Sequence, residues 1–400
     1  MLRIFIVILI ASVGIDRIDL AAGNLDFRLT PYIMLGTIFL AYFFTVFIFS
    51  KKGRSFSKPE QEYGLLILIL CIFLLISVMQ SGDYILSRNR FLLLVFNIFS
   101  AYALMKILSV RRDSELIFVS AAKLGIWIFF IFDIAQGLNF YFGLLPPLGN
   151  AVIDIIPPMY GDLAIRPSGF AADMNLGAFI VATFFFWINR YAKPGWIKSA
   201  YQTSALTLLA LTLSRSGIFA LVVMILSGWI YGAYQANILK IIKISILLGI
   251  VSVIIFALII FLFDMSNYVV LLEERLSFSS DDSGGIHFEL IKRGLEVFLH
   301  HPFFGAGFGA SYLDLVDFFE FDRYSNYHSL FITILAETGL FGFLALMMIL
   351  LLPLFNRCKV PSYGPLIWSL MAFNIFYQAN GAPIFWLILS FAWIYSLVRE

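Results

Sequence analysis

All four histidines of the chain lie within or at the end of one polar stretch, at positions 287, 300, 301 and 328. Imidazole exchanges protons near neutral pH, so histidines gathered in a chain with few titratable groups indicate acid–base chemistry. Each of them except His328 can alternatively cap a helix or lie among lipid headgroups. This stretch is therefore the first place to expect a catalytic group.

Two arginines are candidate anion-binding groups. Arg215 stands between two apolar runs. A cation at that depth is costly unless it meets an anion, a polar cavity or the membrane interface, so Arg215 either binds a ligand or extends to lipid phosphate. Arg166 lies in a loop whose proline and glycine neighbours allow the backbone to approach a ligand, and contact with anionic headgroups is the alternative.

A group of acidic residues follows the histidines and raises the question of a metal site, because hard oxygen ligands bind Mg²⁺ or Ca²⁺. The group contains no Asp-x-Asp pair, and its spacing of about three residues is typical of a solvated helical face. We therefore predict no metal and no other cofactor. The four residues are Asp314, Asp317, Glu320 and Asp322.

The composition determines the elements that carry these groups. Hydrophobic residues make up 61% of the 400 residues and charged residues 13%, which is too apolar for one water-soluble core. Apolar runs of about 17 to 25 residues recur, long enough to cross about 30 Å of hydrocarbon, and they do not alternate as barrel strands do. The sequence predicts an all-α polytopic membrane protein. The net charge of +2, without a long basic run, argues against a nucleic-acid partner.

We predict about twelve transmembrane helices in a single membrane domain, residues 1–400. The predicted spans are 3–15, 30–50, 64–80, 91–109, 116–137, 176–189, 199–213, 217–235, 242–263, 329–355, 363–378 and 382–398. Basic residues concentrate in alternate loops, around residues 51–58, 106–112, 190–198, 240–243 and 357–359. The positive-inside rule places these loops and both termini in the cytoplasm.

Two loops exceed the length needed to reverse direction, and both fall on the outer side: 138–175 and 264–328. Chemistry is expected there. The larger loop, between the ninth and tenth helices, contains a predicted amphipathic helix that lies along the membrane surface. Its apolar face comprises Phe288, Ile291, Leu295, Phe298 and Leu299.

Four short motifs are similar to those of the O-antigen ligase and polymerase superfamily. One is a His-Pro-x-x-Gly-x-Gly turn in the larger loop, and another is a His-Ser pair nine residues ahead of Gly-x-x-Gly. The other two are an Arg-Pro-Ser-Gly segment followed by Asn and Gly, and a Ser-Arg-Ser-Gly segment between two spans. They occupy residues 301–307, 328–342, 166–177 and 214–217.

The resemblance implies a glycosyltransferase that moves a glycan from a polyprenyl diphosphate carrier to an acceptor hydroxyl. His328 is then the expected general base, and Arg215 the expected catalytic cation that neutralises the leaving diphosphate. Glu337 is expected only to line a pocket or to pack. The residues expected to bind substrate are Arg166, His287, Arg293, His301, Gly305 and Gly307.

One position departs from the family pattern. Many members carry an arginine about fifteen residues before the His-Pro turn, where this chain has His287. Either His287 contacts the diphosphate, or Lys292 and Arg293 supply the charge from the next turn.

The resemblance leaves three functions open. The first is a polymerase that extends carrier-linked repeat units at the periplasmic side of the bacterial inner membrane, beside a flippase and a chain-length regulator. The second is a ligase that passes the polymer to lipid A core. The third is a transporter or lipid-binding protein, which the scarcity of ionisable residues within the spans disfavours.

Overall fold

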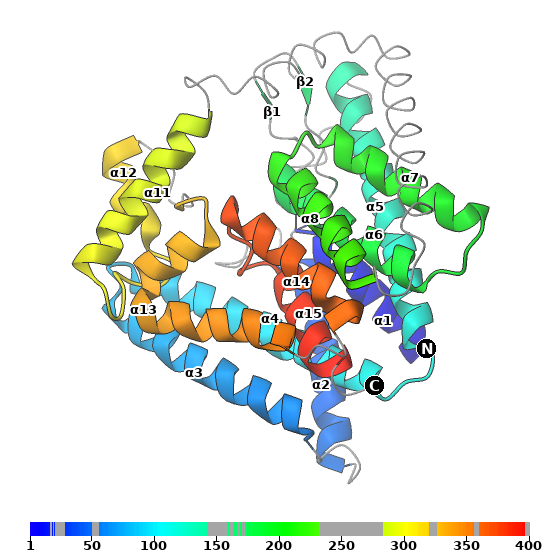
Figure 1. Cartoon of the computed structure of the whole chain (residues 1–400), viewed down its shortest axis with the longest axis horizontal. Helices are drawn as coiled ribbons and strands as arrows, with labels where there is room; N and C mark the ends of the chain where they lie inside the picture. Colours follow the sequence, from blue (N-terminus) through cyan, green and yellow to red (C-terminus); the bar gives the residue numbers. More distant parts are fainter. Residues whose placement is uncertain are drawn as a thin grey trace. The chain divides into compact units, whose positions relative to one another are not determined.

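The computed structural model describes residues 1–16, 18, 20, 29–49, 56–142, 159–160, 164–165, 169, 171, 173–232, 283–319, 326–355 and 360–396. These residues are almost wholly helical (Figure 1). Within them, the β-strands are β1 (Met159–Tyr160) and β2 (Ala164–Ile165), which run antiparallel. The predicted helical class is confirmed. The predicted span 242–263 lies outside the described residues.

The chain divides into two compact units: residues 1–39 with 111–278, and residues 40–110 with 279–400. Helix α2 (Pro31–Phe49) crosses the boundary. The other described helices of the first unit are α1 (Leu2–Ala11), η1 (Ser12–Gly14), α5 (Ser114–Phe142), α6 (Met174–Tyr191), α7 (Trp196–Leu211) and α8 (Arg215–Gly232).

Helix α6 is the centre of the first unit. Every residue from Leu176 to Ile188 is buried, and the helix packs against α5, α7 and α8. Its first turn is capped by Asp173, whose carboxylate accepts from the amides of Asn175 and Leu176 at 2.7 and 3.0 Å, as an N-cap side chain does. This cap sets the start of α6 and thereby the position of Asn175.

The second unit is built around α13, which packs against α3 and α11. A buried ion pair between Lys106 and Glu60, 2.6 Å long, joins α4 to α3. Its described elements are α3 (Lys58–Gln80), α4 (Tyr84–Ser109), α11 (Ser283–His300), α12 (Ser311–Phe319), α13 (Leu330–Leu351), η3 (Leu352–Phe355), α14 (Val360–Ile375), α15 (Pro383–Ser390) and η4 (Phe391–Ser396).

Among the residues that the structure describes, four helical segments are long and apolar enough to cross a membrane: 58–80, 84–109, 114–136 and 330–355. Shorter apolar segments are 2–14, 31–47, 215–231 and 383–395. On α3 the exposed residues Leu65, Leu68 and Ile72 recur at helical spacing, which is typical of a face that meets lipid. The chain is therefore a helical membrane protein, and the count of twelve spans stays a prediction.

Several helices begin earlier than their apolar runs. Helix α3 starts at Lys58 rather than residue 64, because Ser57 and Glu60 form a capping box. Helix α4 starts at Tyr84 rather than residue 91, because the Asp83 carboxylate accepts from the Leu86 amide at 3.0 Å. Polar first turns thus extend these helices beyond the segments that hydropathy marks.

Helix α11 is amphipathic, as predicted, but it packs through a different face. Leu290 and Gly294 are buried, and Gly294 packs closely against Ile332 and Tyr327. The predicted apolar face is largely exposed: Phe288 is 67% exposed and Leu299 73%. A helix that buries one stripe against protein and exposes a second apolar stripe suits a position at the membrane surface.

Candidate functional site

Helix α13 is interrupted at Gly339, whose φ of 68° and ψ of −169° are not helical. In an unbroken helix, the amides of Leu340 and Phe341 would donate to the carbonyls of Ala336 and Glu337. The break separates these two donors from these two acceptors. Buried backbone groups of this kind require other partners.

The His-Pro-x-x-Gly-x-Gly turn supplies those partners. The carbonyls of Pro302 and Phe303 accept from the two amides of α13 at 2.8 and 3.5 Å. The amides of Ala306 and Gly307 donate to the two carbonyls at 2.8 and 3.1 Å. Two motifs separated by about thirty residues therefore form one hydrogen-bonded unit, which we call the interlocked turn (residues 302–307 with 336–341).

Glycine is required on both sides of the interlocked turn. Gly305 has a φ of 74°, and a Cβ there would overlap the carbonyl group of Glu337. A Cβ at Gly339 would overlap the carbonyl group of Phe303. Gly307, with a φ of 127°, lies against the backbone of Ser81. Packing thus accounts for Gly305 and Gly307, and their contact with substrate stays a prediction.

His328 precedes α13 and lies against His287 of α11, with ring centroids 4.6 Å apart and ring planes at 82°. Its φ is 52°, and its amide donates to the Asn326 side chain at 2.8 Å. Burial lowers the pKa of His328 below its usual value, because desolvation disfavours the imidazolium. His328 is therefore neutral near pH 7, the form that a general base requires.

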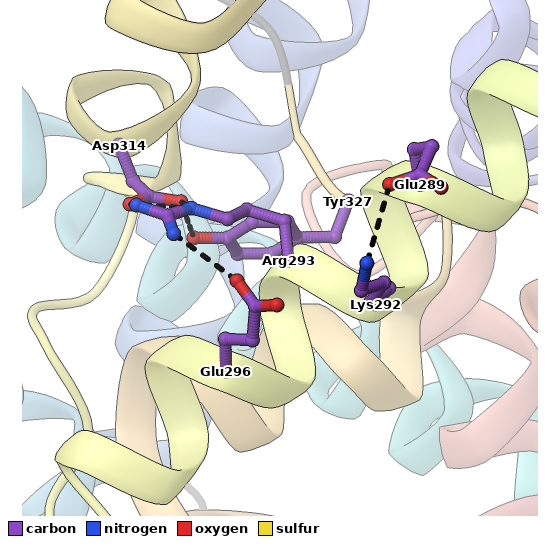
Figure 2. A network of polar contacts seen from close by, with 6 residues as sticks. All are labelled: Glu289, Lys292, Arg293, Glu296, Asp314 and Tyr327. Carbon is purple, nitrogen blue, oxygen red and sulfur yellow. Dashed lines mark hydrogen bonds and ion pairs between the residues drawn. The ribbon is translucent and has the colours of Figure 1, made fainter.

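Arg293 is held between carboxylates, as Figure 2 shows. Its Nε and Nη2 donate to Asp314 at distances of 2.6 to 3.1 Å, and Nη1 donates to Glu296 at 3.1 Å. The hydrogen bonds that Arg293 donates to Asp314 raise the pKa of Arg293 above its usual value. Tyr327 donates to the same Asp314 carboxylate at 3.3 Å. The charge of Arg293 is thus already neutralised by protein groups.

The second source of positive charge considered from the sequence is more exposed. Lys292 approaches Glu289 at 4.0 Å, and both side chains are about half exposed (Figure 2). Such a pair contributes little to stability. The ammonium of Lys292 therefore lies on the outer surface of α11.

A cavity of about 300 Å³ lies between α11, the interlocked turn, α12 and α13. Glu337, expected from the sequence to line a pocket or to pack, is buried at its wall. Its Oε1 accepts from the Ser311 amide at 3.4 Å, and Oε2 has no hydrogen-bond partner within the described residues. The polar lining comprises Arg293, His300, His301, Ser311, Asp314, Tyr327 and Glu337.

Of the acidic residues considered as metal ligands, Asp314 is committed to Arg293. Glu320 and Asp322 lie outside the described residues. Across the described ranges, no group of three or more histidine, cysteine or acidic side chains has the geometry to hold a metal ion.

In the first unit, the Ser-Arg-Ser-Gly motif forms the start of α8. Ser214 caps the helix by accepting from the Gly217 amide at 3.1 Å, and it donates to the Asn175 side chain at 2.8 Å. A Cβ at Gly217 would overlap Ala178 of α6. The cap and the close helix packing place Arg215 at the exposed first residue of α8, where the helix dipole favours an anion.

The Arg-Pro-Ser-Gly motif is described only at Gly169. The Gly169 amide donates to Asp133 at 2.7 Å, and its carbonyl accepts from Gln136 at 3.2 Å. These bonds attach the end of the loop to α5. Arg166 itself lies outside the described residues.

The second unit brings together six predicted residues. His287 and His328 are in contact, and the remaining residues lie on the cavity or in the interlocked turn: Arg293, His301, Gly305 and Gly307. Arg215 belongs to the first unit. The predicted roles of all these residues stay predictions.

Sequence reasoning missed Arg90. Its Nη1 donates to the Gly309 carbonyl at 2.6 Å, and its side chain packs against Gly309. The available signal was an ionisable residue near the end of an apolar helix, which at such a position usually has a specific partner.

A family model described as O-antigen ligase matches residues 203–347. This match supports the resemblance to the O-antigen ligase and polymerase superfamily that the motifs indicate. The matched segment contains Arg215, the interlocked turn and His328. A comparison with curated proteins found no match.

Proposed function

We propose that this protein is a member of the O-antigen ligase superfamily and that it polymerises polyprenyl-diphosphate-linked repeat units. The observation that carries the proposal is the position of His328, half-buried and with a lowered pKa, beside His287 at the start of α13. The interlocked turn lies in the same unit. A neutral imidazole in a polar site is suited to remove a proton from a sugar hydroxyl.

In the proposed reaction, the acceptor hydroxyl oxygen attacks C1 of the donor sugar as the bond from C1 to the diphosphate oxygen breaks. The hydroxyl proton passes to His328, and the diphosphate leaves on its lipid carrier with the bonding electron pair. Negative charge grows on the leaving oxygen, so cationic donors stabilise the transition state. We assign this role to Arg215, with Arg166 as a second contact.

The position of His287 suggests how the departure from the family pattern is accommodated. Arg293 is neutralised by Asp314 and Glu296, so it offers little charge to a diphosphate. His287 lies against the proposed base and is the better candidate for the contact that an arginine makes in other members.

We further propose twelve spans with both termini in the cytoplasm of a bacterial inner membrane. The alternation of basic loops supports this orientation. The two longest loops then face the periplasm, where a flippase and a chain-length regulator are expected partners.

Ligation is the second candidate, because the matched family is described as O-antigen ligase. The same bond would form, with lipid A core as acceptor. Purified protein in nanodiscs, supplied with a polyprenyl-diphosphate oligosaccharide with and without lipid A core, separates the two. Longer glycan on the carrier alone supports polymerisation, and product only with lipid A core supports ligation. Carrier binding without product from either acceptor indicates a transporter or lipid-binding protein.

Arg215→Ala is expected to lower the kcat of glycan transfer about 10²- to 10³-fold, the range seen when one hydrogen-bond donor to the transition state is lost. Lysine should restore part of the rate, because it keeps the charge but not the bidentate geometry. Initial rates of chain extension measure both. Arg190→Ala, at the exposed end of α6, is the matched control, and equal rates for Arg215→Ala and Arg190→Ala would contradict the assignment.

The pH dependence follows from the lowered pKa of His328. Burial favours neutral imidazole, so the base form dominates above the folded-state pKa, and the rate falls only as pH drops through it. The acid limb of kcat/KM is therefore expected below the usual histidine value of about 6.5. An acid limb above that value would show that burial does not control this group.

A further inference from the structure

The proposed transfer reaction assigns no ligand to the cavity beside the interlocked turn. Its volume of about 300 Å³ lies at the lower end of the range for small-molecule sites, and would hold roughly ten water molecules at about 30 Å³ each. The lining combines oxygen and nitrogen groups with apolar side chains of α11 and α12. This mixture suits a small polar ligand that also has hydrocarbon faces.

The charges around the cavity do not favour a diphosphate. Arg293 forms ion pairs with Asp314 and Glu296. Arg90 interacts electrostatically with Glu337 and donates a hydrogen bond to a backbone carbonyl. Two guanidinium groups thus face three carboxyl groups, so no excess of positive charge remains. A neutral ligand that donates hydrogen bonds is the better match.

The acceptors for such a ligand are present at two positions. Asp314 lines the cavity, and its side chain is 21% exposed. At the buried wall, Glu337 Oε2 accepts no hydrogen bond from the described residues, although a buried carboxylate oxygen normally has a donor. The imidazoles of His300 and His301 add groups that can donate or accept.

We propose that this cavity binds one pyranose ring of a neutral glycan, whose hydroxyl groups donate to Asp314 and Glu337. The assignment rests on the proposed function, which supplies a glycan substrate, and it adds a sugar subsite separate from the diphosphate contacts. Either the donor glycan or the acceptor glycan can supply the ring. Both present the same hydroxyl chemistry.

Two variants test the site by different means. Glu337→Gln keeps the size of the side chain but replaces one acceptor with an amide that donates. Ala310→Leu fills the cavity and leaves its polar groups unchanged, since Ala310 lies in the lining. Glu289→Gln is the matched control, because Glu289 is an exposed α11 carboxylate outside the lining.

The probe is a set of methyl glycosides of glucose, galactose and mannose, with binding to the full-length protein in nanodiscs followed by saturation-transfer difference NMR. At least one glycoside is expected to bind the wild type, with affinity lowered about tenfold or more by each cavity variant and unchanged by the control. Absence of binding to all three, equal binding to all four proteins, or displacement by inorganic pyrophosphate would overturn the proposal.

The same variants separate this proposal from the proposed function. If the protein binds a glycoside but makes no product, the sugar subsite is supported and the glycosyltransferase function is contradicted. If both cavity variants form product with unchanged KM for donor and acceptor, the glycosyltransferase function is supported and the sugar subsite is contradicted. If KM rises only for the acceptor, the ring belongs to the acceptor; if it rises only for the carrier-linked donor, the ring belongs to the donor.

Discussion

Loss of the imidazole at position 328 is expected to lower kcat of glycan transfer by about 10²- to 10⁴-fold, the usual contribution of a general base. The acceptor hydroxyl would then lose its proton to water, without a positioned base. Initial rates at saturating donor and acceptor measure the effect. The KM for the carrier-linked donor is expected to change little, because His328 acts on the acceptor hydroxyl.

The choice of substitution matters because His328 has a positive φ. Alanine at such a position costs about 1 to 2 kcal/mol, and asparagine tolerates it better. His328→Asn should therefore unfold near the wild-type temperature, His328→Ala should unfold slightly lower, and both should lose the activity. If a folded His328→Asn protein kept more than a tenth of the wild-type rate, the assignment of His328 as the general base would be contradicted.

Substitution of Gly339 or Gly305 by alanine is expected to destabilise the second unit by more than about 1 to 3 kcal/mol, the cost of the positive φ alone. The added Cβ would also overlap backbone of the facing segment, so the hydrogen bonds of the interlocked turn would be lost. Thermal unfolding in detergent, followed by the yield of monodisperse protein, measures the loss.

Gly64→Ala is the matched control. Gly64 lies in α3 with open space at the Cβ position, and alanine is the better helix former by about 1 kcal/mol. This variant should equal or exceed the wild type in stability. Unchanged unfolding of Gly339→Ala would show that the interlocked turn does not have the hydrogen bonds described.

The sequence predicted the helical class and the positions of most apolar helices, because lipid imposes a length and a composition on each span. It predicted the starts of α3 and α4 less well. Hydropathy does not register a polar first turn, and Ser57 and Asp83 cap helices that extend several residues before the apolar run.

The candidate site was predicted as a set of motifs without their mutual contacts. Gly305 and Gly307 were expected to bind substrate, and nothing in their spacing indicates that residues 302–307 exchange hydrogen bonds with a break in α13. Arg293 was expected to face substrate, and its pairing with Asp314 depends on how α11 and α12 pack. The acidic spacing that indicated a solvated face could not reveal this partner.

The interlocked turn has a consequence for biogenesis. Without residues 302–307, two amides and the Ala336 carbonyl of α13 would enter hydrocarbon unsatisfied, at several kcal/mol each. The Glu337 carbonyl would keep only the Ser77 hydroxyl as a donor. Residues 302–307 precede α13 in the chain, so they emerge from the ribosome first and are present when the helix partitions into the bilayer. Stable insertion of α13 then requires docking of the loop, and lesions in the turn would appear as degraded, poorly integrated protein rather than as an inactive enzyme.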